Sequence, residues 1–329
     1  MKVKGAIQSN LRYANGNLTF KTNDIFSHIV NIGGIDYTAN KEKASGANSF
    51  IFKLYCSQEE DADSLNPVKV LKLPKRPARF YNGKRCSEGS QPKIIQRFTR
   101  EQNALTECKS KLLGNVIEID CVGYIQCEGE DGKEYFPFYM MDYADADLRK
   151  FMESHMDLDK YDKLQLCYDL TKGIDELYSL GYYHRDIKPE NILFFSRTNW
   201  KIGDLGLVAK RDDDFDAEQE SENVIGPKGW LSPEAMNRCL RASSPYKRFD
   251  CKIDHQSDIF QLGKVFWYIF QGNVPIGCIK RSDFLERDED IYSLIKQMLN
   301  HSKSRRPQNT GIVLKELERL LNKEAGVRK

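Results

Sequence analysis

The segment Tyr183–Asn191 constrains this chain more than any other part of it. It reads Tyr-His-Arg-Asp-Ile-Lys-Pro-Glu-Asn, and Asp204-Leu205-Gly206 follows thirteen residues after Asn191. Together the two motifs supply carboxylates, an amide and cations at fixed separations. A fold that uses them together must return residue 204 to the neighbourhood of residue 186.

The flanking sequence predicts a helix before this segment and a hairpin after it. Apolar residues recur at three- and four-residue steps from Leu164 to Tyr178, and Gly181 stands where a C-terminal cap belongs. Residues 192–195 and 200–203 read as short strands around the turn-forming residues 196–199. We therefore expect the loop to hang from a helix end and the hairpin to deliver Asp204 to it.

These motifs resemble those of the protein kinase family. The resemblance implies that Asp186 accepts the proton of a substrate hydroxyl and that Asn191 and Asp204 hold Mg²⁺. Lys188 matches the lysine that serine/threonine-type kinases point at the γ-phosphate. In this chemistry the protein mainly positions ATP and neutralises its charge, so ATP and Mg²⁺ are the expected cofactors.

A second resemblance to the family lies near residue 70. Val68–Leu73 alternates as a strand, and the match to Val-Ala-Ile-Lys falls on Lys72, with Val70 on the same face and Lys69 on the opposite one. A predicted helix follows, with an inward stripe made by Ile94, Phe98, Glu101, Leu105, Cys108 and Leu112. Because Glu101 is the one charged member of that stripe, we infer an ion pair between Lys72 and Glu101.

The resemblance also assigns nucleotide contacts. The implied set is Ala44, Gly46, Ser49, Ile51, Val70, Lys72, Met141, Asp142, Ala144, Asp147 and Leu193. Met141 takes the gatekeeper position beside the adenine pocket, and the backbones of Asp142 and Ala144 would bond adenine. Asp147 would contact the ribose hydroxyls, and it also suits the N-cap of a helix that begins at Leu148.

The phosphate-covering loop departs most from the family pattern. Residues 44–53 keep one glycine of the usual three, Gly46, although Ala44 and Ser49 are small. Val70 also replaces the alanine common above the adenine ring. Both departures leave an alternative open, a pseudokinase scaffold that binds partners or nucleotide without efficient catalysis.

Later signatures favour a polypeptide substrate. Trp230–Glu234 resembles the end of a kinase activation segment, and Glu234 would pair with Arg306. Asp258 would anchor the catalytic loop from a helix that is apolar nearly all round and therefore buried.

Two features bear on the acceptor and on activation. Lys188 favours serine or threonine, whereas Pro227 resembles the tyrosine-kinase pattern, and we weight Lys188 more heavily. The acidic run 211–223 occupies the position that relatives often phosphorylate. Glu222 or a neighbouring carboxylate is a candidate for a permanent negative charge in place of that phosphate, and Ser221 is a candidate phosphorylation switch. The acidity of the run would also favour substrates with basic residues. A solvated loop explains the run equally well.

Length and composition suit a bilobal α+β protein-kinase-like fold. We expect an N-terminal extension over 1–35 with a β-hairpin at Asn15-Gly16, a small antiparallel-sheet lobe with one main helix over 36–143, a larger helical lobe over 144–322, and a tail over 323–329.

Net charge restricts the classes of binding partner, and cysteine content indicates the cellular compartment. The net charge of +2 does not indicate a nucleic-acid partner, and the basic residues between 75 and 100 suit either a solvated loop or an acidic partner. Nine cysteines without a Cys-x-x-Cys pair predict neither a disulfide framework nor a zinc site, which fits a reducing cytosol. No signal peptide or membrane span is predicted, and the oligomeric state stays open.

Overall fold

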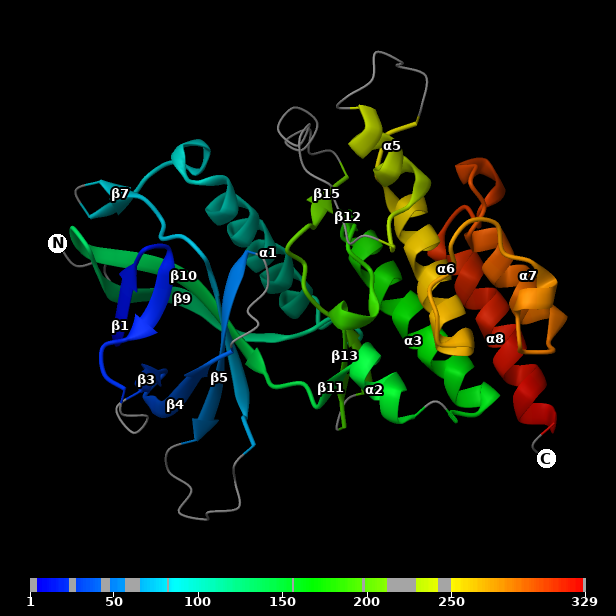
Figure 1. Cartoon of the computed structure of the whole chain (residues 1–329), viewed down its shortest axis with the longest axis horizontal. Coiled ribbons are helices and arrows are strands. Elements are labelled where there is room, and N and C mark those ends of the chain that lie inside the picture. The colour runs from blue at the N-terminus through cyan, green and yellow to red at the C-terminus, as the bar shows by residue number, and fades with distance from the viewer. Residues whose placement is uncertain are drawn as a thin grey trace. The chain divides into compact units, whose positions relative to one another are not determined.

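The computed structural model describes residues 5–23, 28–42, 48–56, 66–81, 83–155, 157–196, 199–211, 229–241 and 250–327. The chain divides into two compact units, coloured continuously from blue to red in Figure 1. The first unit comprises residues 1–110 and 118–143, and the second comprises 111–117 and 144–329. Residues 111–117, which we expected in the small lobe, therefore belong to the second unit.

The first unit is built on one sheet of eight strands and a long helix (Figure 1). Its sheet strands are β1 (Ile7–Ala14), β2 (Asn17–Phe20), β3 (Ile29–Ile32), β4 (Ile35–Lys41), β5 (Ser49–Cys56), β6 (Lys69–Pro74), β9 (Ile119–Gly129) and β10 (Gly132–Asp142), and the helix is α1 (Lys93–Ser110). The strand order is β2-β1-β9-β10-β6-β5-β4-β3. Neighbouring strands are antiparallel, with the exception of the parallel pair β1 and β9. A short hairpin of β7 (Phe80–Tyr81) and β8 (Lys84–Arg85) lies between β6 and α1.

The hairpin expected at Asn15-Gly16 is present and forms the β1–β2 edge of this sheet. Asn15 and Gly16 have φ of 50° and 74°, the left-handed pair that a two-residue type I′ turn requires. The register runs from Leu11 opposite Phe20 to Ala14 opposite Asn17. Because β1, β2 and β3 all belong to the main sheet, residues 7–32 are part of the small lobe rather than an appendage to it.

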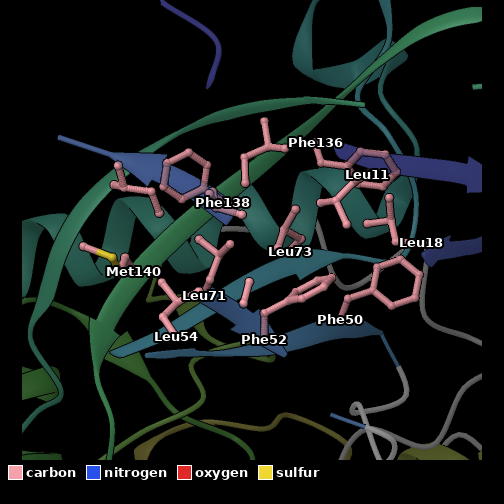
Figure 2. Close-up of a cluster of buried hydrophobic side chains, with 14 of the residues drawn as sticks. Leu11, Leu18, Phe50, Phe52, Leu54, Leu71, Leu73, Phe136, Phe138 and Met140 are labelled. Atoms are coloured by element: carbon pink, nitrogen blue, oxygen red, sulfur yellow. The ribbon is translucent and has the colours of Figure 1, made fainter. Parts of the chain in front are cut away.

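One face of the sheet holds a continuous hydrophobic core. Figure 2 shows side chains from β1, β2, β5, β6 and β10 that point toward one another. The core comprises Leu11, Leu18, Val30, Ile32, Tyr37, Ala39, Phe50, Phe52, Leu54, Leu71, Leu73, Ile125, Cys127, Phe136, Phe138 and Met140. All eight strands contribute, so the N-terminal strands cover an apolar face that would otherwise meet water.

The opposite face of the sheet carries Lys72. Cross-strand pairing sets Ile51 and Tyr139 beside Lys72, and Met141 beside Val70. Since directly opposed residues point to the same side, these residues share one face. Val70 and Lys72 therefore lie on one face, as their spacing predicts.

Helix α1 contacts β6, β9 and β10, and it buries Phe98, Glu101, Leu105 and Cys108 of the predicted stripe. The prediction that Leu112 continues this buried stripe was wrong. The helix ends at Ser110, and Leu112 has a left-handed φ of 55° and is 88% exposed.

The second unit is mostly helical. Its described elements are α2 (Leu148–Ser154), α3 (Lys160–Ser179), α5 (Pro233–Arg241), α6 (His255–Gln271), α7 (Glu289–Met298) and α8 (Thr310–Val327), with the short strands β11 (Ala146–Asp147), β12 (Tyr182–Tyr183), β13 (Ile192–Phe195), β14 (Asn199–Ile202) and β15 (Ala209–Lys210). β11, β13 and β14 form one small sheet and β12 pairs with β15. The predicted hairpin around residues 196–199 is thus β13–β14.

Helix α6 is the central core helix of this unit. Asp254 caps its first turn in a capping box with Ser257, and the buried residues run all round it. Helix α8 continues beyond residue 322 to Val327. Its buried residues include Val313, Leu317 and Leu320, whereas Ile312 is 45% exposed.

Candidate active site

The catalytic-type loop begins where helix α3 ends. Leu180 is the C-cap of α3, and Gly181 follows with a left-handed φ of 80°, as its position in the sequence predicts. Strand β12 then leads into residues 184–191. The loop is therefore attached to a helix end on one side and to the β13–β14 hairpin on the other.

Helix α6 holds the backbone of this loop. The buried Asp258 carboxylate accepts the N–H groups of His184 and Arg185, each at 2.8 Å. This confirms the anchoring role inferred from the sequence. Gln261, one turn later, accepts the N–H of Ile187 at 3.1 Å and donates to the carbonyl of Arg185 at 3.2 Å. Sequence reasoning missed Gln261, although a second polar residue three positions after Asp258 in an apolar helix was a usable signal.

His184 connects the loop to the segment that carries Asp204. Its Nε2 lies 3.0 Å from the carbonyl oxygen of Gly203, and its Nδ1 lies 3.2 Å from the backbone nitrogen of Asp186. A carbonyl must receive a proton and an N–H must donate one, so these partners assign the neutral tautomer protonated on Nε2. Burial lowers the pKa of His184, which favours the same neutral form.

The Asp186 carboxylate is held at one oxygen. Its Oδ2 accepts hydrogen bonds from Lys188 Nζ at 3.0 Å and from Asn191 Nδ2 at 2.9 Å. Its Oδ1 is buried and has no hydrogen-bond partner among the residues that the structure describes. Burial raises the pKa of Asp186 to about 6; Lys188 opposes that rise and the charge of Asp204 adds to it.

Asn191 and Asp204 have donor atoms that suit Mg²⁺. Both N–H bonds of the Asn191 amide point to Asp186, at its backbone carbonyl (2.8 Å) and its Oδ2, so the amide oxygen is the atom that a cation would take. The described part of the chain contains no group of three His, Cys, Asp or Glu that could hold a metal by itself. Mg²⁺ needs no such group, because it commonly binds one or two protein oxygens together with nucleotide phosphates.

Backbone strain coincides with these residues. Arg185 and Asp204 adopt left-handed φ values of 69° and 50°, which are unfavourable for residues other than glycine. Such conformations cost roughly 1–3 kcal/mol each and persist where the surroundings enforce them. At Arg185, the backbone N–H donates to Asp258 and the backbone carbonyl accepts from Gln261, and these two hydrogen bonds hold the conformation in place.

The predicted ion pair is present in the first unit. Lys72 Nζ lies 2.8 Å from Glu101 Oε1, and both side chains are nearly inaccessible to solvent. Lys69 instead binds Asp120 at 2.8 Å and Asp142 at 2.6 Å, as expected for the opposite face of the strand. Sequence reasoning missed Tyr139, whose hydroxyl donates to the same Glu101 oxygen at 2.8 Å.

Comparison with known proteins decides the family. A family model described as the protein kinase domain matches residues 70–328. The chain belongs to the protein kinase family. The two units accordingly are the small and large lobes of a kinase fold, and the match covers about half of the first unit and nearly all of the second.

The curated relatives are kinases of more than one acceptor type. The chain is 27% identical to a probable serine/threonine-protein kinase PknB of Bifidobacterium longum, over 55% of this chain and 24% of that protein. It is 27% identical to the serine/threonine-protein kinase cds1 of Schizosaccharomyces pombe, over 59% and 41%, and 29% identical to the tyrosine-protein kinase Btk of Drosophila melanogaster, over 44% and 18%. The matched region thus spans less than half the length of each relative.

The nucleotide-contact residues of the kinase pattern are grouped within each unit. In the small lobe Ser49, Ile51, Val70 and Met141 lie on the sheet face of Lys72, and Asp142 ends β10. In the large lobe Asp147 pairs with Leu193 across β11 and β13. Ala144 begins the large-lobe segment that follows β10.

Asp147 is also the N-cap of α2. Its carboxylate accepts the backbone N–H of Lys150 at 2.9 Å, which confirms the capping interpretation. Two other members of the predicted nucleotide set, Ala44 and Gly46, lie outside the described residues.

The segment Trp230–Glu234, which resembles the end of a kinase activation segment, is tied to the large-lobe core. Arg306 makes two bonds to the Glu234 carboxylate, at 2.7 and 3.2 Å, and both side chains are buried. The predicted pair is therefore present, in bidentate geometry. Pro227 and the acidic residues 212–223, including Ser221 and Glu222, lie outside the described residues. In the part of the chain that is described, no helix is long and apolar enough to cross a bilayer.

Proposed function

We propose that this chain is a protein kinase that transfers the γ-phosphate of ATP to a protein hydroxyl. The observation that carries the proposal is the state of Asp186. One carboxylate oxygen is fixed by Lys188 and Asn191, while the other is buried without a partner among the described residues. A buried acceptor atom without a donor is costly unless a ligand supplies one, and a substrate hydroxyl is such a donor.

In the proposed reaction Asp186 Oδ1 accepts the hydroxyl proton as the substrate oxygen bonds to the γ-phosphorus. The bond between the γ-phosphorus and the bridging oxygen breaks, and ADP is the leaving group. Asn191 and Asp204 would hold Mg²⁺, which when bound neutralises charge on the phosphate oxygens. Lys188, 3.0 Å from Asp186, would contribute a compact positive charge beside the transferred group.

The small-lobe residues would hold the nucleotide. Lys72 would bind the α- and β-phosphates and Glu101 would orient Lys72, as the kinase pattern implies. Val70 and Met141, side by side on the Lys72 face, would line the adenine site. Asp147 would reach the ribose with the carboxylate oxygen that does not cap α2.

We propose serine or threonine as the acceptor. Support comes from Lys188, which lies next to Asp186 as serine/threonine-type kinases place it, while the curated relatives include both acceptor classes. Phosphoamino-acid analysis of the autophosphorylated chain tests this. We expect phosphoserine or phosphothreonine, and phosphotyrosine alone would contradict it. A preference for basic residues around the acceptor stays a prediction, and the sequence preference measured on a peptide array tests it. A cytosolic location also stays a prediction.

The decisive experiment is phosphate transfer from γ-labelled ATP to the purified chain and to a generic protein substrate. We expect incorporation that requires Mg²⁺ and that is lost in Asp204→Ala. Nucleotide binding without any transfer, in the wild type as in Asp204→Ala, would instead support the pseudokinase alternative, which the single glycine of the phosphate loop favours.

The pH dependence of the reaction should report Asp186. Because the base must be ionised and its pKa is raised to about 6, kcat/KM for ATP should fall as pH drops through about 6. Lys188 lowers that pKa, so Lys188→Met should move the acidic limb of the profile to higher pH, whatever it does to the maximum rate. A limb that stays in place in Lys188→Met would show that another group titrates.

A further inference from the structure

Lys72, Glu101 and Tyr139 form a buried triad in the small lobe. Glu101 Oε1 accepts from Lys72 Nζ and from the Tyr139 hydroxyl, each at 2.8 Å. The three side chains come from β6, α1 and β10, and their exposed fractions are 9%, 2% and 1%. Lys72 and Tyr139 are directly opposed across the β6–β10 ladder, so both reach Glu101 from the same sheet face.

Tyr139 touches α1 at two successive turns. Its ring stacks on Phe98 with centroids 5.6 Å apart and an interplanar angle of 18°, and its hydroxyl bonds Glu101 three residues later. Residues three apart occupy the same helix face, so both contacts fasten one stripe of α1 to β10. The Lys72 ammonium also lies 5.6 Å from the centre of the Tyr139 ring.

A buried carboxylate has room for several donors, and a bond from a hydroxyl to an ionised oxygen is among the stronger hydrogen bonds. The Tyr139 bond therefore favours the position of Glu101 in which it also meets Lys72. Displacement of α1 from β10 would break the hydroxyl bond and the ring stack together with the ion pair.

We propose that Tyr139 is a positioning residue that keeps α1 and Glu101 where Glu101 can orient Lys72. The expected effect on ATP kinetics rests on the proposed kinase function. The expected effect on the stability of α1 does not, because it is measured on the protein without substrate. Tyr139 acts through Glu101.

The test is Tyr139→Phe, which removes one oxygen and leaves the ring stack on Phe98. We expect kcat/KM for ATP to fall about tenfold, the effect of losing one hydrogen bond to a charged group. In the free protein, amide hydrogen exchange of residues 98–105 should become about tenfold faster, because α1 is held less firmly. Unchanged kinetics together with unchanged exchange would overturn the proposal.

Tyr135→Phe is the matched control. Tyr135 is also buried on β10, but its hydroxyl lies 3.3 Å from Gln126 on β9 rather than from α1. We expect neither ATP kinetics nor α1 exchange to change. Equal effects in both variants would assign the Tyr139 effect to general loosening of β10 and would overturn the proposal.

A second arm separates positioning from simple packing. In a Glu101→Ala background the acceptor is gone, so adding Tyr139→Phe should change kcat/KM and α1 exchange by less than about twofold. A full tenfold further loss would mean that the hydroxyl acts independently of Glu101 and would refute the inference. If the wild type transfers no phosphate, the kinase proposal fails, and the exchange measurements still decide whether Tyr139 holds α1.

Discussion

A chain shortened to begin at residue 33 should fail to fold its small lobe. The deletion removes β1, β2 and β3, which carry four core residues, Leu11, Leu18, Val30 and Ile32, each at most 4% exposed. Burial of one such side chain is worth roughly 1.5–3 kcal/mol, so the four together match the roughly 5–15 kcal/mol by which whole domains are stable. The deletion also uncovers the apolar face of β5, β6 and β10 that Figure 2 shows.

The measurement is soluble yield and denaturant unfolding of the shortened chain beside one that begins at residue 5. We expect the longer chain to unfold cooperatively and the shorter one to aggregate, because an uncovered sheet face and a free strand edge both promote association. A shortened chain that remains soluble and unfolds at the wild-type denaturant concentration would show that the remaining strands bury their own core.

A point variant tests the same contact more gently. Leu18 is fully buried and its neighbour Thr19 is exposed on the same strand. Leu18→Ala should cost about 2–5 kcal/mol of unfolding free energy, whereas Thr19→Ala should stay within about 0.5 kcal/mol. Equal losses in the two variants would place the effect in the strand backbone rather than in the core.

Asp186→Asn should lower the phosphate-transfer rate at saturating ATP by about a hundredfold or more. Asparagine retains an oxygen that can accept from Lys188, but it cannot take a proton from the substrate hydroxyl. Because ATP contacts are assigned to other residues, the KM for ATP should change by less than about threefold. A rate within about threefold of wild type would remove Asp186 from the role of base.

The stability of Asp186→Asn gives an independent check. Burial raises the pKa of Asp186 above its unfolded value, so the folded state binds this proton more tightly and loses stability as pH rises from about 4 to about 6. At pH 7 the ionised side chain is therefore unfavourable to folding, and Asp186→Asn should melt at the same temperature or higher. A large fall in the melting temperature would mean that the activity loss reflects unfolding.

Asp169→Asn is the matched control for both measurements. Asp169 lies on α3, outside the loop, and burial raises its pKa as well. We expect transfer within about twofold of wild type, because a half-buried carboxylate without a substrate contact has no catalytic task. A comparable loss of activity in this variant would point to a general sensitivity of the fold to carboxylate replacement.

Local chemistry made much of the large lobe predictable. Periodic apolar residues, Gly181 and the two short apolar runs marked α3 and the β13–β14 hairpin, because each signal acts over a few neighbouring residues. The pair of Glu234 with Arg306 and the anchor at Asp258 followed from family motifs. Gln261 and the tautomer of His184 did not, since both depend on which backbone groups the loop leaves without partners.

The small lobe shows the opposite balance. Asn15-Gly16 predicted the β1–β2 hairpin, and the alternation of side chains predicted that Lys72 and Val70 share one face. No local pattern predicted that β1 would pair with β9 in parallel or that the hairpin would cover the core. Leu112 continued the apolar spacing of α1 yet is exposed, because a helix period does not say where the helix stops.

The sequence by itself determined the chemical groups, their order and the elements that carry them, because motif spacing and side-chain periodicity are properties of the chain. Tertiary structure alone decided that Tyr139 joins the Lys72–Glu101 pair and that Asp186 keeps one buried oxygen without a partner among the described residues. Hydrogen-bond partners separated by dozens of residues are chosen by packing, which no local pattern records.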